Sequence, residues 1–368
     1  MNITKLANAW VDRLGIYEPG RPIEEVARDL GFKSVDDIIK LASNENALGP
    51  SPKAVKAITT AAKSMHLYPD GGAFYLRRAL AGRLRVDMDQ ICVTNGSNEG
   101  IEFLGHVFLG RGTNIVMADR AFVVYKLIAA AYEAETISVP MTDFTHDLDA
   151  MLAAITPRTK IVFISNPNNP TGTMVDGTAI DRFMAKVPEH VVVALDEAYV
   201  ELLPEKQQPD TLKHMREGRN VFILRTFSKT YGLAGLRIGY TVGSKDGIGL
   251  LNRVRQPFNV NALGQAAALA ALDDEAHVRR TRKMVTDGLR FLEKAFDQMG
   301  LDYVSSVVNF ILVKTGRGRE VFQSLEREKV IVRPMDPYGL PEYVRVTVGT
   351  ASENRFFIKA LKKVLSGK

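Results

Sequence analysis

Lys229, just past the middle of the chain, is a flexible charged residue directly after a predicted strand, at a position where the fold does not need one. The run VFILRTF (221–227) is apolar enough for a buried strand, and Lys229 follows it at once. Thr226 and Ser228 supply hydroxyls beside the lysine, and Arg237 follows eight residues later, a combination that suits a bound phosphate. A partly desolvated lysine beside other cations has a lowered pKa and can act as an amine nucleophile. The pattern therefore predicts amine chemistry next to an anion site, although a lysine near a turn is more often a solvated surface residue.

The stretch TNGSNEGIEFLGHVFLG (94–110) predicts a phosphate site at a helix N-terminus. A strand ends there, and Gly96, Ser97 and Asn98 precede apolar positions with helical spacing. Free N–H groups and the positive end of the helix dipole attract a phosphate, and a glycine lets the backbone approach it closely. The same pattern also occurs as plain structure in many α/β proteins. Neither G-x-G-x-x-G nor G-x-x-x-x-G-K-[ST] occurs, so a dinucleotide site and a P-loop both lose support.

Two more strand ends carry polar residues. ISNPNNPTG (164–172) closes one strand with turn-forming residues, among which Asn169 could donate an amide hydrogen to a ligand. VVVALDEAYVEL (191–202) places Asp196 at the end of a strongly apolar strand, where an unpaired carboxylate would be costly to desolvate. Asp196 therefore needs a partner such as a capping amide or a ligand cation, and Tyr199, three residues later, could face the same pocket.

The elements that must position these residues indicate an α/β protein. Short β-branched runs alternate with helical patterns, which predicts a mostly parallel sheet, and the runs are apolar throughout, as strands covered on both faces should be. They are QICVTN (90–95), NIVMAD (114–119), ETISVP (135–140), KIVFISN (160–166), VVVALDE (191–197) and VFILRTF. Ligands of such sheets bind at the carboxyl ends of the strands, where all the residues above are expected.

A change of texture near residue 255 indicates a second, smaller α+β lobe. One helical pattern runs from Gly264 to Met299, followed by the strand-like runs FILVKT, VIVRP and YVRVTVG and a last amphipathic helix from Glu353. We expect residues 46–255 to form the large domain, residues 256–368 the small one, and residues 1–45 to join the small domain or a neighbouring subunit.

Composition excludes several classes of protein. The 368 residues are 46% hydrophobic and 24% charged, with a net charge of +6 that is scattered along the chain, so nucleic acid is not an expected partner. The single cysteine, Cys92, rules out an intramolecular disulfide and suits a reducing cytoplasm. No apolar run approaches a membrane span and no signal peptide is visible. The histidines lack metal-ligand spacing, and no serine lies in a G-x-S-x-G turn.

The motifs together resemble a known family. NPNNPTG, DEAY and SKTYGLAGLRIGY, with TNGSNEGI upstream and VRVTVGT downstream, are similar to those of the fold-type-I pyridoxal-phosphate aminotransferases, and most of all to the histidinol-phosphate aminotransferases. The resemblance runs in order from about Tyr17 to the end. It implies a large domain with a mostly parallel seven-stranded sheet, a smaller α+β domain, a pyridoxal 5'-phosphate cofactor, and a homodimer with shared active sites.

The resemblance also implies roles for the cofactor-binding residues. Lys229 would bind the cofactor covalently and shuttle the proton, and Asp196 would pair with the pyridinium nitrogen. Asn169 and Tyr199 would hydrogen-bond the 3-oxygen of the ring, while Phe122 would stack on it. The family more often has Pro-Thr-Tyr where this chain has Arg120, Ala121 and Phe122, which puts any hydroxyl role at that position in doubt. The phosphate would be held by Gly96, Ser97, Asn98, Thr226, Ser228 and Arg237, with Tyr68 reaching it in the neighbouring subunit.

On the substrate side, Arg345 would bind the anionic group of the substrate with help from Arg333, and Asn44 and Tyr17 would line the pocket. Spacing alone is equally typical of an edge-strand arginine in water at position 345. The expected reaction is a ping-pong transfer of an amino group from L-histidinol phosphate to 2-oxoglutarate in histidine biosynthesis. Two alternatives stay open, an aromatic-amino-acid transaminase and, more remotely, a decarboxylase of a phosphate-bearing amino acid. A transcription regulator is disfavoured because only about forty residues precede the first shared motif.

Overall fold

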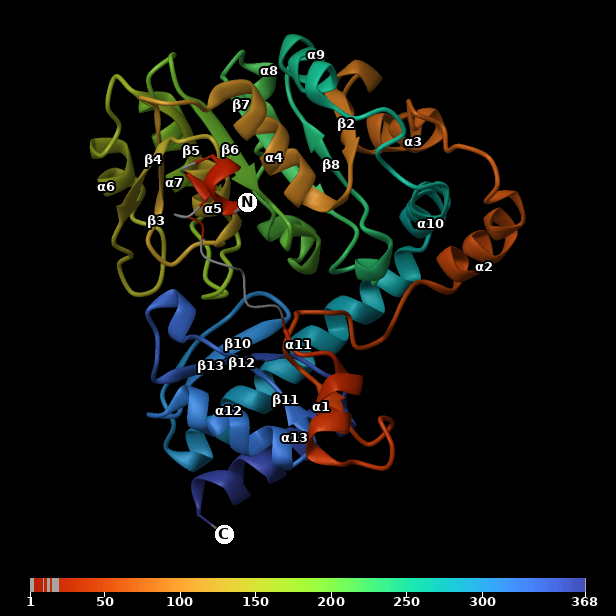
Figure 1. The fold of residues 1–368 in the computed structure, drawn as a ribbon, viewed down its shortest axis with the longest axis vertical. Helices are drawn as coiled ribbons and strands as arrows, with labels where there is room; N and C mark the ends of the chain where they lie inside the picture. The colour runs from red at the N-terminus through yellow and green to blue at the C-terminus, as the bar shows by residue number, and fades with distance from the viewer. Residues whose placement is uncertain (1–2, 9, 12–13, 15–19, 368) are drawn as a thin grey trace.

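A computed structural model describes residues 3–8, 10–11, 14 and 20–367 of the chain. Its largest element is a seven-stranded sheet, in which the strands lie in the order β2-β8-β7-β6-β5-β3-β4 (Figure 1). The strands are β2 (Ile91–Thr94), β3 (Asn114–Ala118), β4 (Glu135–Val139), β5 (Thr159–Ser165), β6 (Val192–Asp196), β7 (Val221–Thr226) and β8 (Gly239–Val242). All six strands predicted from the apolar runs are confirmed.

The sheet is parallel except for β8, which pairs antiparallel with both β2 and β7. The strand β8 returns after the short segment that carries Lys229 and Arg237, so its first residue lies at the edge where β2 and β7 end. Its four residues, GYTV, follow the lysine motif too closely to stand out as a separate apolar run. This antiparallel strand is therefore a feature that the sequence pattern did not reveal.

Both faces of the large sheet are buried along its inner strands, as their apolar runs predict, whereas the edge strand β4 is partly exposed, so the prediction of full burial is wrong for it. Along β6 the side chains of Val193 and Leu195 pack in one hydrophobic cluster, whereas Val192 and Ala194 pack in another. Alternate residues of a strand point to opposite faces, so the two clusters lie on the two sides of the sheet. The helices packed around it are α2 (Pro52–Ala61), α3 (Phe74–Leu84), α4 (Gly96–Phe108), α5 (Val124–Ala131), α6 (Leu148–Ala153), α7 (Gly177–Lys186), α8 (Leu212–Arg216), α9 (Lys245–Val254) and α10 (Ala262–Leu272).

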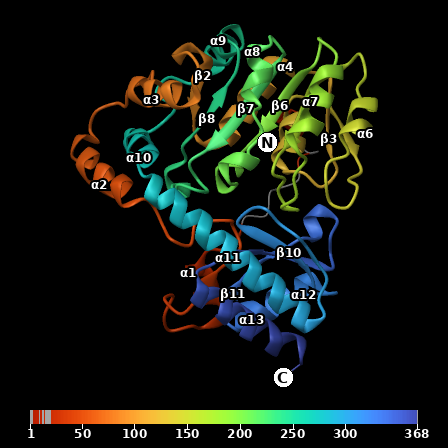
Figure 2. The same ribbon diagram turned by 180° about the vertical axis from the view of Figure 1, so that it is seen from behind.

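A smaller antiparallel sheet follows, with the strand order β12-β13-β10-β9. Its strands are β9 (Tyr303–Val304), β10 (Phe310–Lys314), β12 (Arg333–Pro334) and β13 (Tyr343–Thr347), packed with α11 (Glu275–Met299), α12 (Gly318–Arg327) and α13 (Ala351–Leu365). Figures 1 and 2 show the long helix α11 crossing from the side of the large sheet to the small one.

The N-terminal segment joins this smaller unit. Helix α1 (Ile23–Leu30) contributes Val26 and Ala27 to its hydrophobic cluster, and β1 (Ile39–Lys40) pairs in parallel with β11 (Val330–Ile331). The segment therefore has a strand partner that the sequence did not suggest.

The predicted single helix from Gly264 to Met299 is wrong, because it is two helices that break at Asp273. Asp274 caps the second helix: its side chain accepts a hydrogen bond from the backbone N–H of His277 at 3.2 Å. The apolar residues of α10, and Val278 of α11, pack with α2 and α3 in a hydrophobic cluster of the large sheet. Val285, further along α11, packs instead in the hydrophobic cluster of the smaller unit. We propose a domain boundary inside α11, C-terminal to the predicted one at residue 255.

Within the described part of the chain, no helix is long and apolar enough to cross a membrane. The same residues contain no group of three or more histidine, cysteine, aspartate or glutamate side chains arranged to hold a metal ion. Cys92 lies on β2 and is buried and unpaired, as predicted.

Candidate active site

A cavity of about 250 Å³ opens at the carboxyl edge of the large sheet. The segments that follow β2, β3, β5, β6 and β7 all lead into it, so the lining residues meet at the carboxyl ends of the strands. The cavity is lined by Ser43, Glu45, Ser97, Asn98, Phe122, Ser165, Asn169, Asp196, Ala198, Tyr199, Thr226, Ser228, Lys229, Ala234 and Arg237.

One end of the cavity collects hydroxyl groups and a guanidinium. Thr226 Oγ1 lies 2.9 Å from Ser228 Oγ, and Arg237 Nη1 donates to Ser228 Oγ at 3.4 Å. Gly96, at the start of α4, has a φ of +69°, and a Cβ added there would lie 2.7 Å from Arg237 Nη2. The backbone conformation therefore favours glycine at position 96, and any larger residue would also displace the guanidinium of Arg237. The N-terminus of α4 and this guanidinium are groups suited to an anion.

Lys229 projects its amine into the middle of the cavity. Its Nζ donates to the backbone oxygen of Ser43 at 3.3 Å and lies 5.5 Å from the centre of the Tyr199 ring. Burial, and then the nearby charges of Arg345 and Arg237, lower the pKa of Lys229 to about 8. The unprotonated fraction of this amine near neutral pH therefore exceeds that of an ordinary lysine by two orders of magnitude or more.

Asp196 is the buried acid of the site. Its Oδ2 accepts a hydrogen bond from Tyr125 Oη at 2.7 Å, and its Oδ1 accepts one from the backbone N–H of Ala198 at 3.1 Å. Burial raises the pKa of Asp196 to about 6, while the Tyr125 and Ala198 hydrogen bonds oppose that rise. We predicted that the Asp196 carboxylate needs a partner, and its partners are the Tyr125 hydroxyl and the backbone amide of Ala198.

Tyr199 and Asn169 each accept a hydrogen bond from a residue far away in the sequence, one in the N-terminal segment and one in the small sheet. Asn44 Nδ2 donates to the Tyr199 hydroxyl at 3.0 Å, and Arg345 Nη1 donates to Asn169 Oδ1 at 2.6 Å. Asn169 lines the cavity, so this contact places the guanidinium of Arg345 next to it. The N-terminal segment and the small sheet therefore help to fix the side chains of the cavity.

The edge-strand alternative for Arg345 is wrong. Strand β13 lies between β12 and β10, and Arg345 is only 7% exposed. Its Nη2 donates to the backbone oxygen of Ala42 at 3.0 Å, and its guanidinium carbon lies 5.1 Å from the centre of the Phe310 ring. Val344 and Val346 pack in the small hydrophobic cluster, which leaves Arg345 on the face toward the cavity.

Five of the predicted residues that the structure describes lie outside the cavity lining, namely Asn44, Tyr68, Gly96, Arg333 and Arg345. Asn44 is buried behind Tyr199, and Arg333 is the register partner of Arg345 across β12 and β13. Tyr68 is 83% exposed and stacks on Phe258 with ring centres 4.8 Å apart. Tyr17 lies outside the described residues. The roles suggested for the predicted site residues, inside and outside the lining, stay predictions.

Several lining residues were not predicted. Ser43 and Glu45 flank the predicted Asn44, and Ser165 is the last residue of β5.

Tyr125, which contacts Asp196 from outside the cavity lining, was not predicted either. It lies three residues after Phe122, but in the sequence it looks like one more apolar position of a helix. Its spacing of one helical turn from Phe122 is the signal that could have indicated it.

Comparisons with known proteins agree with this arrangement. The family model described as aminotransferase class I and II matches residues 36–361. The chain is 52% identical to a histidinol-phosphate aminotransferase of Akkermansia muciniphila over 99% of this chain and 100% of that protein, and 50% identical to one of Moorella thermoacetica over 95% and 90%.

Solved structures give the same result. A histidinol-phosphate aminotransferase from Sinorhizobium meliloti, in complex with pyridoxal-5'-phosphate, superposes with a TM-score of 0.89 at 25% identity, covering 98% of both chains. The predicted fold type is thereby confirmed. The chain belongs to the class I and II aminotransferases.

Proposed function

We propose that this aminotransferase uses pyridoxal 5'-phosphate to transfer an amino group between L-histidinol phosphate and 2-oxoglutarate. The observation that carries the proposal is a single cavity that unites the Lys229 amine, the Asp196 carboxylate and the anion site around Arg237. The homologous histidinol-phosphate aminotransferases, at 52% and 50% identity, support this choice of substrate.

The residues present fit the cofactor. A phosphate needs hydrogen-bond donors and a cation, which Ser97, Ser228 and Arg237 supply at one end of the cavity. The space that a Cβ at Gly96 would fill lies beside this guanidinium, so the backbone at that point leaves room for an anion. Asp196 supplies a buried carboxylate for a cationic ring nitrogen, and Phe122 supplies an aromatic face.

When bound, pyridoxal phosphate supplies an electron sink that lets a proton leave the carbon bearing the amino group of the substrate. The lowered pKa of Lys229 makes its amine both a nucleophile and a base near neutral pH. Asp196 must be ionised to attract a ring cation, and its pKa of about 6 leaves it mostly ionised at pH 7.

Arg345 supports recognition of an anionic substrate. Its guanidinium is buried, touches Asn169 of the cavity and is held by the backbone at Ala42, so its position is fixed before any ligand arrives. A planar guanidinium in a fixed position is suited to a carboxylate or a phosphate. The guanidinium of Arg345 would bind the phosphate of histidinol phosphate in one half-reaction and the carboxylate of 2-oxoglutarate in the other.

An exposed apolar surface supports the homodimer. Its residues come from the segment after α2, from the start of α3 and from the loop before α10, and they are Met65, Leu67, Tyr68, Phe74, Tyr75 and Phe258. Exposed large apolar side chains that gather on one face are typical of protein interfaces. Tyr68 is the most exposed of the six in the single chain. This is expected of a residue that reaches into the site of a partner subunit. The cytoplasmic location expected from the single cysteine stays a prediction.

The substrate assignment is tested by comparing kcat/KM for histidinol phosphate, phenylalanine, tyrosine and histidine, each with 2-oxoglutarate. We expect histidinol phosphate to exceed phenylalanine by about tenfold or more, in line with the names of the relatives at 52% and 50% identity. The Arg345→Gln variant should lose activity with every donor. A clear preference for phenylalanine would instead make the chain an aromatic transaminase, and release of carbon dioxide would make it a decarboxylase.

A further inference from the structure

Tyr125 is a buried hydroxyl that touches the catalytic acid from behind. It belongs to α5, is fully buried, and donates from Oη to Asp196 Oδ2 at 2.7 Å. A hydrogen bond between a hydroxyl and a carboxylate is stronger than one between neutral groups. Tyr125 does not line the cavity, so any effect that it has on the reaction must pass through a lining residue, and Asp196 is the acid to which it donates a hydrogen bond.

The ring of Tyr125 is fixed on two sides. It stacks on Phe163 of β5 with ring centres 4.5 Å apart and planes 6° apart, and its edge meets Phe122 at 5.8 Å. An aromatic side chain clamped in this way loses its rotational freedom, so the hydroxyl is held at one point. The same cluster therefore touches the aromatic side chain of the cavity and its buried acid.

We propose that Tyr125 is a positioning residue that keeps the Asp196 carboxylate ionised and in one orientation for the ring nitrogen of the cofactor. The inference rests on the proposed use of pyridoxal phosphate. A donated hydrogen bond stabilises the carboxylate over the carboxylic acid, which opposes the effect of burial on Asp196. Burial and the neighbouring carboxylate raise the pKa of Tyr125 well above its ordinary value, so its hydroxyl stays protonated and stays a donor.

The other charged and titratable groups around Asp196 leave this role to Tyr125. Lys229 favours the ionised carboxylate, but its charge acts less strongly than the tyrosine hydrogen bond. Glu197, the next residue, opposes ionisation. Tyr199 bonds to Asn44 and is a neutral group near neutral pH because burial raises its pKa. Tyr125 is the side chain that donates directly to Asp196 among the described residues.

The test is the pH dependence of cofactor binding to the cofactor-free protein, which needs no turnover. The dissociation constant for pyridoxal phosphate is measured by absorbance from pH 5 to 8.5 for the wild type and for Tyr125→Phe. In the wild type the affinity should fall as the pH drops through about 6, where Asp196 takes up a proton. In Tyr125→Phe the same fall should begin about one pH unit higher, because loss of one hydrogen bond to a charged group is worth about a tenfold change.

Tyr132→Phe is the matched control, since Tyr132 closes the same helix and its hydroxyl contacts His106 at 2.5 Å, away from Asp196. It should titrate like the wild type. Asp196→Asn should bind weakly with no such fall. Thermal melting establishes that each variant is folded.

If Tyr125→Phe does not fold, 3-fluorotyrosine is placed at position 125, because it preserves the shape of the side chain and makes its hydroxyl a stronger donor. The decrease in cofactor affinity should then occur at lower pH than in the wild type. A midpoint that is the same in the folded Tyr125 variant and in Tyr132→Phe would overturn the inference. A wild-type protein that binds no pyridoxal phosphate would overturn the proposed function itself, and this inference with it.

Discussion

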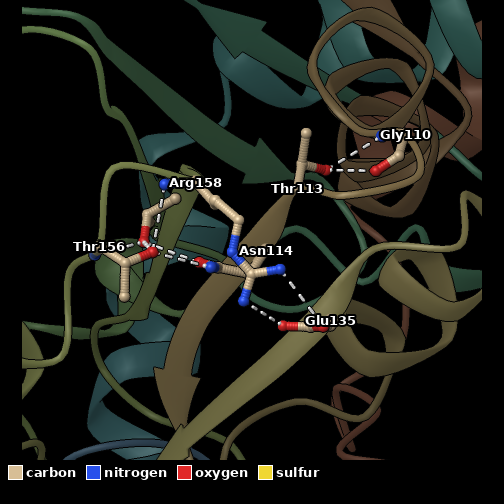
Figure 3. Close-up of polar contacts among 7 residues, drawn as sticks. Gly110, Thr113, Asn114, Glu135, Thr156 and Arg158 are labelled. Carbon is tan, nitrogen blue, oxygen red and sulfur yellow. Dashed lines mark hydrogen bonds and ion pairs between the residues drawn. The ribbon is translucent and has the colours of Figure 1, made fainter.

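The two ends of the large sheet treat polar residues in opposite ways. At the amino end, Asn114 of β3 is completely buried and both ends of its amide are used: Nδ2 donates to Thr156 Oγ1 at 2.9 Å, and Oδ1 accepts from Thr159 Oγ1 at 2.7 Å. Figure 3 shows this cluster, with Arg158 joined to Glu135 beside it. At the carboxyl end, the Lys229 amine makes one hydrogen bond within the described residues, to the backbone oxygen of Ser43 at 3.3 Å, and lines a cavity.

The difference follows from what each end must do. Polar groups that satisfy one another stabilise the fold and leave nothing for a ligand. Polar groups held apart around a cavity have a cost in stability, since Lys229 and Asp196 both carry pKa values shifted against their charged forms by burial. Substitutions at the carboxyl end should therefore remove function and spare stability, whereas those at the amino end should do the reverse.

The largest expected effect is that of Lys229→Met, which keeps the stem of the side chain and removes the amine. Activity should fall by about 1000-fold or more, as for loss of a nucleophile. The cofactor-free variant should be as stable as the wild type or more stable, because the folded state no longer holds a desolvated cation. Activity assays and thermal melting measure the two effects.

The pH dependence sharpens this prediction. Lys229 has a folded pKa of about 8 against an ordinary 10.5, so its charge opposes folding fully below pH 8 and the penalty disappears as the pH approaches 10.5. The stability advantage of Lys229→Met should shrink over that range. A variant that melts well below the wild type at pH 7 would contradict the comparison.

The next effect belongs to the amino end. Asn114→Ala should lower the free energy of unfolding by about 2 kcal/mol, since it removes two hydrogen bonds, one to the part-buried Thr156 and one to the buried Thr159. Chemical denaturation measures the loss. The affinity for pyridoxal phosphate, measured at a temperature where the variant is folded, should be unchanged. A large drop in affinity would mean that the two ends are coupled.

A smaller effect is expected from Gly96→Ala, which adds a Cβ 2.7 Å from Arg237 Nη2 at a φ of +69°. The affinity for the cofactor should drop about tenfold, because the arginine must shift and the turn is strained. Gly82→Ala on α3 is the control: a Cβ there meets nothing within 4 Å, so the change should stabilise the helix slightly. Equal affinity in both variants would refute the close-approach argument.

The smallest effect should come from the exposed pair at the amino end. Arg158→Ala removes the contact of 2.9 Å with Glu135, and both side chains are more than half exposed. Such pairs are worth about 1 kcal/mol or less. The loss, read from denaturation curves, should therefore be well below that of Asn114→Ala. A loss as large would show that the surface pair, and not the buried amide, holds this end together.

Most of the sheet and the centre of the site could be predicted from sequence. Strands buried on both faces show as apolar runs, and ligand-binding residues of an open sheet follow directly after them, which is why Lys229, Asp196 and Asn169 stood out. The antiparallel β8 did not, since four residues give too short a pattern.

The missed contacts depend on packing between segments far apart in the chain. Arg345 resembled a surface residue because the sequence does not show that β12 and β10 flank its strand on both sides. Tyr125 resembled a core position because its one polar atom finds its partner 71 residues away. The break before Asp274 lies inside a continuous helical pattern, where the cap competes with the periodicity.

The central claim is that Lys229 is the residue that binds the cofactor. The most direct measurement incubates the protein with pyridoxal phosphate, reduces it with sodium borohydride, and locates the modified lysine by peptide mass spectrometry. We expect a single stoichiometric adduct on the peptide that contains Lys229, absent in Lys229→Met. An adduct spread over surface lysines, or none at all, would contradict it.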